Sequence, residues 1–208
     1  MNPKSAIVNV LTFLRLPLIF AWLGLAVAQE FVGGFWLAFW ALLSMFLSGI
    51  SDLFDGMLAR KWNVVSTLGK MADPLMDKIF YVVAFPALVW QIARHGDSDA
   101  HALVMLAFTI LYLGRDMWVT FMRSVGAMYG ADVGAMWLGK IRTALSFPCA
   151  GWTYMYLAFH PMLPDSWAFP WLVTCFVFEG FMIAVTILSL YTYTKAYMPH
   201  LKMALARK

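Results

Sequence analysis

The chain has 208 residues, of which 62% are hydrophobic and only 12% are charged. With a mean hydropathy of +0.74, this composition excludes a soluble protein with a single membrane anchor, because no polar stretch is long enough for an extramembrane domain. The net charge of +4 does not indicate a nucleic-acid partner, since aromatic residues do not interleave with a basic stripe. We therefore expect one integral membrane domain over residues 1–208.

Six apolar stretches follow one another along the chain, at residues 10–28, 35–57, 71–93, 101–125, 139–159 and 168–193. Each supplies about 20 residues, which is enough for a helix to cross the hydrocarbon core. They predict an all-α, polytopic membrane protein with six transmembrane helices. Pro17 interrupts the first stretch, so we expect residues 2–13 to form a short N-terminal interfacial helix that turns into the membrane there.

Lysine and arginine residues predict the orientation in the membrane. With six spans, both termini lie on one side, and all Lys and Arg residues except Arg94 fall on or near that side. The positive-inside rule then places both termini and the connections beside them in the cytoplasm, as in a bacterial-type inner or plasma membrane. The basic segment from Lys195 to Lys208 is expected to contact anionic membrane lipids.

Four carboxylates, Asp52, Asp55, Asp73 and Asp77, lie between long apolar stretches. Acidic groups in or near a bilayer are costly, so such a cluster indicates a functional site. Asp52 and Asp55 are spaced i, i+3, and Asp73 and Asp77 are spaced i, i+4, so each pair shares one face of a helix. A short turn through residues 61–68 would make the two helices antiparallel and bring the four carboxylates together.

Like charges at such a separation require bound cations or shared protons. Mg²⁺ or Mn²⁺ fits an all-oxygen ligand set without His or Cys. On the same faces, Gly56, Ala59 and Gly69 leave room for a bulky ligand, although small residues also allow helices to pack closely. Arg60, one turn beyond Gly56, is positioned to meet a phosphate.

Three interpretations of this cluster compete. It is a catalytic site, a cation or proton path of a small cation-coupled transporter, or a structural acid–base network. Transporter sites usually lie near the bilayer midplane in broken helices, whereas these carboxylates lie at a helix end beside a basic connection. The position favours catalysis.

The same residues resemble the signature of the CDP-alcohol phosphotransferase family, D-x2-D-G-x2-A-R-x8-G-x3-D-x3-D. The chain matches it without a gap at Asp52, Asp55, Gly56, Ala59, Arg60, Gly69, Asp73 and Asp77. The resemblance implies six transmembrane helices, usually in a homodimer, with a cytoplasmic site. It also implies transfer of a phosphatidyl-type group from a CDP-linked lipid to an alcohol, with release of CMP.

Carried over by position, the resemblance implies a role for each residue. Asp52, Asp55 and Asp73 would be metal ligands, and Asp77 would ligate metal, act as the general base, or do both. The CDP-lipid would be bound by Asp52, Gly56, Ala59, Arg60 and Gly69. We expect direct in-line attack of the alcohol on the lipid-side phosphorus, although a covalent intermediate is an open alternative.

The acceptor alcohol is predicted from further motifs. Asn9, Leu11, Thr12 and Arg15 resemble an N-terminal motif shared by phosphatidylglycerophosphate synthases and the related eukaryotic-type cardiolipin synthases. Gly114-Arg115-Asp116 and Gly139-Lys140-Ile-Arg142 resemble the phosphatidylglycerophosphate synthase branch of the family. That branch more often has Glu where Asp116 stands and Lys where Arg142 stands. The cations also suggest an acceptor that carries its own phosphate, such as glycerol 3-phosphate, with the residues Arg115, Arg123, Lys140 and Arg142.

Alternatives to this acceptor remain open. The four cations could instead follow the positive-inside rule or pair with Asp116 and Asp132. Within the family, rival acceptors are phosphatidylglycerol, which would give cardiolipin, and an inositol phosphate. Glu179, inside the last apolar stretch, is either a satisfied buried acid or a functional one. Cys149 and Cys175 are interpreted as packing residues.

Overall fold

The structure is a computed structural model. It describes residues 3–64, 67–95, 98–130, 134 and 136–206, without the side chains of residues 67, 68, 70, 71, 73, 95 and 165. Over these residues the chain forms the helices α1 (Pro3–Val32), α2 (Phe35–Trp62), α3 (Thr67–His95), α4 (Asp99–Met128), α5 (Trp137–Phe159), η1 (His160–Met162) and α6 (Asp165–Ala206). The prediction of an all-α protein is confirmed for this described part.

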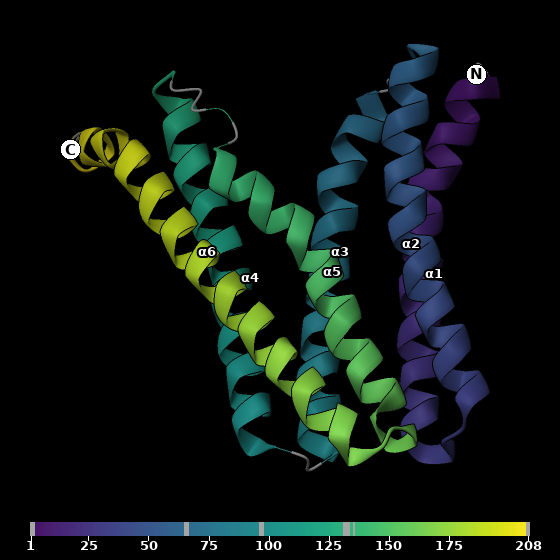
Figure 1. The fold of residues 1–208 in the computed structure, drawn as a ribbon. Helices are drawn as coiled ribbons and strands as arrows, with labels where there is room; N and C mark the ends of the chain where they lie inside the picture. The colour runs from purple at the N-terminus through teal and green to yellow at the C-terminus, as the bar shows by residue number, and fades with distance from the viewer. Residues whose placement is uncertain (1–2, 65–66, 96–97, 131–133, 135, 207–208) are drawn as a thin grey trace.

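The long helices run alternately up and down, so both termini lie at the same end of the bundle (Figure 1). Gly33 and Gly34, at φ 71° and 102°, make the tight turn between α1 and α2, a conformation that side chains with a Cβ rarely adopt. Asn63, at φ 52°, ends α2 in the left-handed region, which asparagine tolerates better than most residues. At the opposite end, Ser98 caps α4 by accepting from the His101 amide at 3.2 Å.

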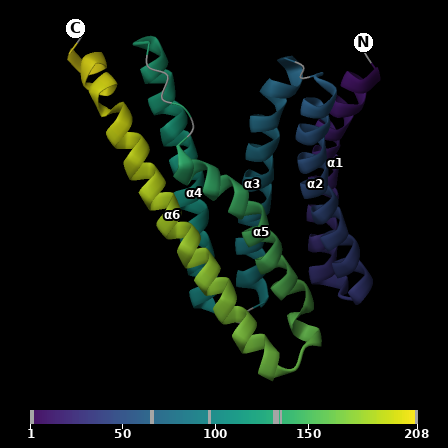
Figure 2. The same cartoon turned by 45° about the horizontal axis from the view of Figure 1, so that its top comes forward.

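The helix α1 is continuous through Pro17, so the expected separate helix over residues 2–13 is not a distinct element. Proline removes one backbone hydrogen bond, but packing against neighbouring helices lets membrane helices tolerate that loss. The helix α1 packs along both α2 and α3, and the three stand together in Figure 2. Their packing explains why the proline does not break the helix.

In the described chain, α1, α2, α4, residues Pro74–Arg94 of α3 and residues Ser166–Ala206 of α6 are long and apolar enough to span a membrane. The helix α5 packs against α2, α3 and α6 and begins below the end of the bundle that carries the termini (Figure 1); it falls outside that group. Its first turns carry polar side chains, including Lys140, Arg142, Thr143 and Ser146. The sixth span therefore stays a prediction.

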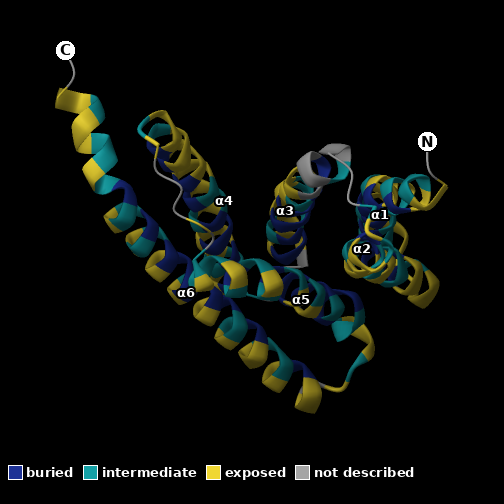
Figure 3. Cartoon of the chain, turned by 90° about the horizontal axis from the view of Figure 1, so that it is seen from above, coloured by how far each residue is buried: buried dark blue, intermediate teal, exposed yellow. Residues whose placement is uncertain are grey.

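Large apolar side chains are exposed on the outside of the bundle, including Trp36, Met117 and Val177, at 67–75% exposure. Viewed from the end that carries the termini, buried positions face inward and exposed positions face outward (Figure 3). This arrangement inverts the surface of a soluble protein, where contiguous apolar patches of this extent are rare. It is the arrangement of an integral membrane protein.

Candidate active site

A cavity of about 840 Å³ lies between the helices α1, α2 and α3 on one side and α4, α5 and α6 on the other. Among its described lining residues are six cationic and three acidic side chains, an excess of three positive charges. The acids are Asp52, Asp77 and Asp116, and the cations are Arg15, Lys78, Arg115, Arg123, Lys140 and Arg142. Such a cavity favours anionic ligands, because low-dielectric walls strengthen the attraction of its charges.

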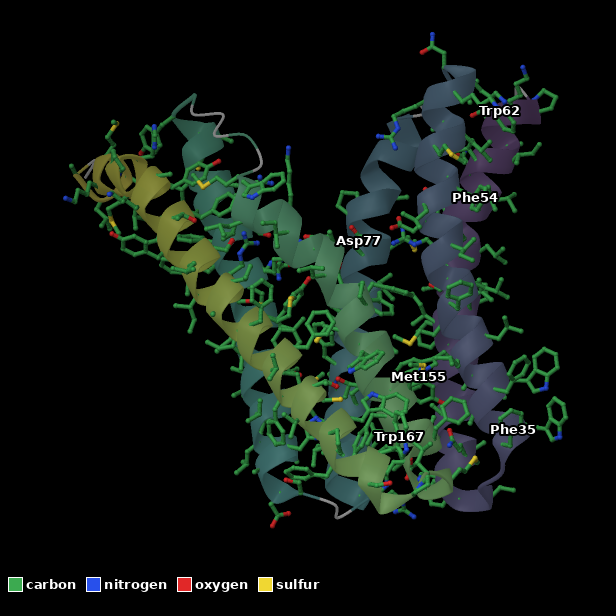
Figure 4. The ribbon with its side chains drawn as sticks, in the orientation of Figure 1. Phe35, Phe54, Trp62, Asp77, Met155 and Trp167 are labelled. Atoms are coloured by element: carbon green, nitrogen blue, oxygen red, sulfur yellow. The ribbon has the colours of Figure 1, made fainter. Side chains whose placement is uncertain are left out.

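Asp52 and Asp77, from the two halves of the acidic signature, meet at a shared cation. One Nη of Arg15 lies 2.8 Å from Asp52 Oδ1, and the other donates to Asp77 Oδ1 at 2.6 Å. The Arg15 side chain is only 6% exposed. Figure 4 shows Asp77 on α3, in the half of the bundle that carries the termini. The structure thus brings these two predicted site residues together.

Asp55 lies one turn along α2 from Asp52 and is 3% exposed. Its Oδ2 accepts a hydrogen bond of 2.7 Å from the Thr12 hydroxyl of α1. Asp55 is not among the residues that line the cavity, and its described side-chain contact is with α1. The predicted fourth carboxylate, Asp73, has its backbone in α3, but its side chain lies outside the described residues.

The described side chains test the predicted metal set only in part. They contain no group of three or more His, Cys, Asp or Glu residues close enough to hold a metal ion, and Asp73 is not one of them. Asp52 and Asp77 do fit a cation, because both already contact the same positive group. Carboxylate oxygens are also the ligands that Mg²⁺ and Mn²⁺ prefer. The ligand set therefore remains a prediction.

Of the five residues predicted to bind the CDP-lipid, Asp52 lines the cavity. The other four lie closer to the α2–α3 turn in sequence. Arg60 is exposed, and its Nε donates to the Gly56 carbonyl at 3.0 Å. A Cβ at Gly56 would meet only the Arg60 guanidinium, at 3.9 Å. Ala59 is 9% exposed, and Gly69 is half-buried. Gly56 thus has the open surroundings that the prediction expected of it, although none of these four residues lines the described cavity.

The four predicted acceptor-binding cations, Arg115, Arg123, Lys140 and Arg142, all line the cavity. Arg115 contacts Asp116 at 3.1 Å and donates to the Ser189 hydroxyl at 2.6 Å. Arg142 also donates to Asp116. For Arg115 and Arg142 the structure thus shows the pairing with Asp116 that was the alternative to an acceptor-binding role. Asp132, the other proposed partner, lies outside the described residues.

Asp116 offsets only one positive charge of this group. The Arg142 guanidinium lies 3.9 Å from the centre of the Tyr112 ring, and three buried nitrogens, Nε of Arg115 and Nε and Nη1 of Arg142, have no hydrogen-bond partner among the described atoms. Buried donors without partners are costly. The arrangement therefore suits an anionic group that would accept hydrogen bonds from them.

The structure adds residues that sequence reasoning did not assign to the site. Tyr193 of α6 lines the cavity, with Arg115 and Arg123 at 4.8 and 5.5 Å from its ring centre. Its hydroxyl accepts from the Met136 amide at 2.9 Å. Arg15 and Thr12 carried a signal, since both belong to the N-terminal motif and Arg15 is a charge inside an apolar stretch. Tyr193 carried none, because a tyrosine in a membrane helix is ordinary.

Glu179 lies apart from this cavity, buried between α4, α5 and α6. It contacts His101 Nε2 at 3.0 Å and accepts from the Thr153 hydroxyl at 3.1 Å. Both contacts involve Oε1, whereas the buried Oε2 has no hydrogen-bond partner among the described atoms, so the choice between a satisfied buried acid and a functional one stays open. Cys149 and Cys175 are both buried and free of disulfides, as expected of packing residues.

Comparison with known proteins identifies the family of the chain. The sequence profile of the family described as CDP-alcohol phosphatidyltransferase matches residues 5–178. A cardiolipin synthase (CMP-forming) of Streptomyces coelicolor is 30% identical over 164 residues, which cover 69% of this chain and 74% of that protein.

Two further relatives are CDP-diacylglycerol–glycerol-3-phosphate 3-phosphatidyltransferases. The one from Mycoplasma genitalium is 30% identical over 159 residues, which cover 71% of this chain and 62% of that protein. The one from Escherichia coli K12 is 29% identical over 117 residues, which cover 56% and 61%. The profile match covers both halves of the acidic signature and most of the helices, and the chain is therefore an integral membrane member of the CDP-alcohol phosphatidyltransferase family.

Proposed function

We propose that this protein transfers a phosphatidyl group from CDP-diacylglycerol to glycerol 3-phosphate, giving phosphatidylglycerophosphate and CMP. One observation carries the proposal: a single cavity has Asp52 and Asp77 on one wall and four cations on the other. A diphosphate bound near the carboxylates and a phosphorylated alcohol bound near the cations would bring the two substrates together.

The cationic wall supports an acceptor with its own phosphate. This wall carries four positive charges, from Arg115, Arg123, Lys140 and Arg142, and one negative charge, from Asp116, which leaves an excess of three. A guanidinium group can donate two parallel hydrogen bonds to two oxygens of one phosphate. A neutral alcohol would leave this excess positive charge without a counterion. Glycerol 3-phosphate supplies the missing anion while leaving a hydroxyl free to react.

Asp77 is the proposed general base. It would take the proton of the acceptor hydroxyl, and that oxygen would form a new bond to the lipid-side phosphorus of CDP-diacylglycerol. The bond from this phosphorus to the bridging diphosphate oxygen would break, and CMP would leave with the electron pair. The contact with Arg15 uses Oδ1 of Asp77, so the proton would go to the other carboxylate oxygen, Oδ2.

Asp52, Asp55, Asp73 and Asp77 are the proposed ligands of Mg²⁺ or Mn²⁺, which would neutralise the diphosphate and the charge that develops on the departing CMP. Thr12 would orient Asp55 through their hydrogen bond. Gly56, Ala59 and Gly69 would leave room for the cytidine, and Arg60 would contact the nucleotide phosphates.

We further propose that both termini and the cavity face the cytoplasm. The termini share one end of the bundle with the α2–α3 and α4–α5 connections (Figure 1), whereas Arg94 ends α3 at the other. The positive-inside rule supports this orientation. The homodimer implied by the resemblance stays a prediction, which cross-linking in native membranes would test.

A second acceptor, phosphatidylglycerol, is favoured by one observation: the Streptomyces relative is a cardiolipin synthase (CMP-forming). Phosphatidylglycerol also carries a phosphate, so the cationic wall does not exclude it. Inositol phosphate is a third candidate on the same charge argument. The family membership leaves the cation-coupled transporter without support.

The test is CMP release from the purified protein supplied with CDP-diacylglycerol. Glycerol 3-phosphate, phosphatidylglycerol and inositol phosphate are offered one at a time, with Mg²⁺, Mn²⁺ or a chelator. We expect metal-dependent CMP release with glycerol 3-phosphate and formation of phosphatidylglycerophosphate. If CMP is released with phosphatidylglycerol and with neither of the other alcohols, phosphatidylglycerol is the acceptor and glycerol 3-phosphate is not. If CMP is released with none of the three alcohols, the proposed reaction is wrong.

A further inference from the structure

Arg15 occupies the position between the two carboxylates that face the cavity. It projects from α1, which lies outside the two helices of the acidic signature, and its side chain is 6% exposed. Each of its terminal nitrogens contacts a different carboxylate, Asp52 of α2 or Asp77 of α3. A single buried cation thus joins three helices at the point where the proposed chemistry occurs.

The two contacts of Arg15 differ in quality. The contact with Asp77 is an aligned hydrogen bond of 2.6 Å. The contact with Asp52 is an ion pair of 2.8 Å, but the nitrogen involved makes no aligned hydrogen bond with any described atom. Since hydrogen-bond strength falls steeply with misalignment, the Asp52 contact is held by charge alone. Asp52 is also the more exposed of the two carboxylates, at 45% against 33%.

A guanidinium on one oxygen of each carboxylate disfavours a divalent cation at the same two carboxylates, because the like charges repel and the guanidinium occupies part of the available oxygen lone pairs. We propose that Arg15 is a positioning residue that holds Asp52 and Asp77 toward one another and competes with a divalent cation for these two carboxylates. This inference rests on the proposed function, which makes them metal ligands. Arg15 would thus keep the empty site assembled and would lower its affinity for metal.

Displacement of Arg15 would not remove its charge from the site. The side chain lines the cavity, so a guanidinium released from Asp52 and Asp77 has room to turn toward a bound phosphate. Binding of metal and of an anionic substrate would then favour one another, since the substrate stabilises the released position of Arg15. Thr12, one turn away on α1, holds Asp55, so one face of α1 supports both acids of α2.

The test measures metal binding in the absence of substrate, with purified full-length protein in detergent. Free Mn²⁺ is followed by electron paramagnetic resonance for wild type, Arg15→Gln, Arg15→Lys and Arg94→Gln. We expect Arg15→Gln to bind Mn²⁺ on the order of tenfold more tightly than wild type. In Arg15→Lys the ammonium group cannot contact both carboxylates through two separate nitrogens, so this variant should bind Mn²⁺ about threefold more tightly than wild type.

The thermal midpoint supplies a second measurement on the same proteins. Without Arg15 the two carboxylates repel, so Arg15→Gln should unfold at a lower temperature than wild type in chelator and should recover in saturating Mn²⁺. Arg94→Gln is the matched control, because it also removes an ion-paired arginine, the partner of Glu30 at 3.9 Å, from the opposite end of the bundle. It should leave Mn²⁺ affinity at the wild-type value.

Unchanged Mn²⁺ affinity in both Arg15 variants would overturn the inference, as would a thermal loss in Arg15→Gln that Mn²⁺ does not repair. If Arg15→Gln does not fold, the Arg15→Lys affinity decides the question alone. These outcomes leave the proposed function intact when wild type still releases CMP in the presence of Mn²⁺. By contrast, the proposed function would be overturned as well if neither wild type nor Arg15→Gln bound Mn²⁺ and wild type released no CMP.

Discussion

Thr12 of α1 donates a hydrogen bond of 2.7 Å to Asp55 of α2, and both side chains are almost fully buried. The N-terminal motif and the acidic signature are more than 40 residues apart in sequence, yet this bond makes them parts of one structure. Buried carboxylates require such partners, because an unsatisfied one loses its hydration without compensation. Thr12 therefore fixes where Asp55 points.

Replacing Thr12 by Val keeps the shape of the side chain and removes the hydroxyl. We expect the free energy of unfolding to fall by about 1–3 kcal/mol, the cost of leaving a buried acceptor unsatisfied, and CMP release to slow. Denaturation curves and turnover measure the two effects. Thr12→Ser, which retains the hydroxyl, is the control, and equal behaviour of the Val and Ser variants would show that the bond contributes nothing.

Asp77→Asn tests the proposed base. The amide cannot take a proton but can still accept from Arg15, so the variant should fold and its thermal midpoint should remain near that of wild type. Turnover should fall by about 10²–10⁴-fold, the range typical of a lost general base. CMP release at saturating CDP-diacylglycerol and acceptor is the measurement. Normal turnover in a correctly folded variant would exclude Asp77 from the mechanism.

Arg123→Ala tests whether the cationic wall of the cavity binds the acceptor, and of the arginines in that wall Arg123 is the one whose loss should disturb the fold least. Arg123 is exposed and its hydrogen bond to the Tyr193 hydroxyl is long, at 3.5 Å, whereas Arg115 and Arg142 are buried against Asp116. We expect KM for glycerol 3-phosphate to rise about tenfold, the effect of losing one charge-assisted hydrogen bond. Arg123→Lys should retain much of the affinity, and KM for CDP-diacylglycerol should stay the same. A change in KM for CDP-diacylglycerol alone would contradict the assignment.

Gly49→Ala tests the apolar wall of the cavity. A Cβ at Gly49 would lie 2.5 Å from the Phe147 ring, which packs 4.9 Å from the centre of the Phe80 ring. We expect a loss of about 1–3 kcal/mol in the free energy of unfolding, as for other overpacked cores. Gly24→Ala is the control, because nothing lies within 4 Å of its Cβ position.

The same position allows a compensating change. Phe147→Leu removes the ring that a new methyl group would strike, so the Gly49→Ala and Phe147→Leu double variant should be more stable than the sum of the single losses predicts. The free energies of unfolding of the four proteins form the cycle. Strict additivity would mean that the two side chains do not meet.

The helical period placed Asp52 and Asp55 on one face of α2, but three residues along a helix still turn the side chain by about 60° relative to its predecessor. That turn separates their partners, so Asp52, which lines the cavity, contacts Arg15, whereas Asp55, which does not line it, contacts Thr12. The spacing of the two residues could not predict which of them faces the cavity, because their partners, Arg15 and Thr12, are set by how α1 packs against α2. Similarly, Pro17 predicted a break that the packing of α1 overrides.

The sequence by itself determined that this protein is helical and lies in a membrane, and which family it belongs to, because apolar run length and eight residues at fixed spacing are local properties of the chain. Only the tertiary structure decided that Arg15 joins Asp52 to Asp77 and that Arg115, Arg123, Lys140 and Arg142 face the same cavity. Such contacts join helices distant in sequence, and their partners are chosen by how the helices pack against one another.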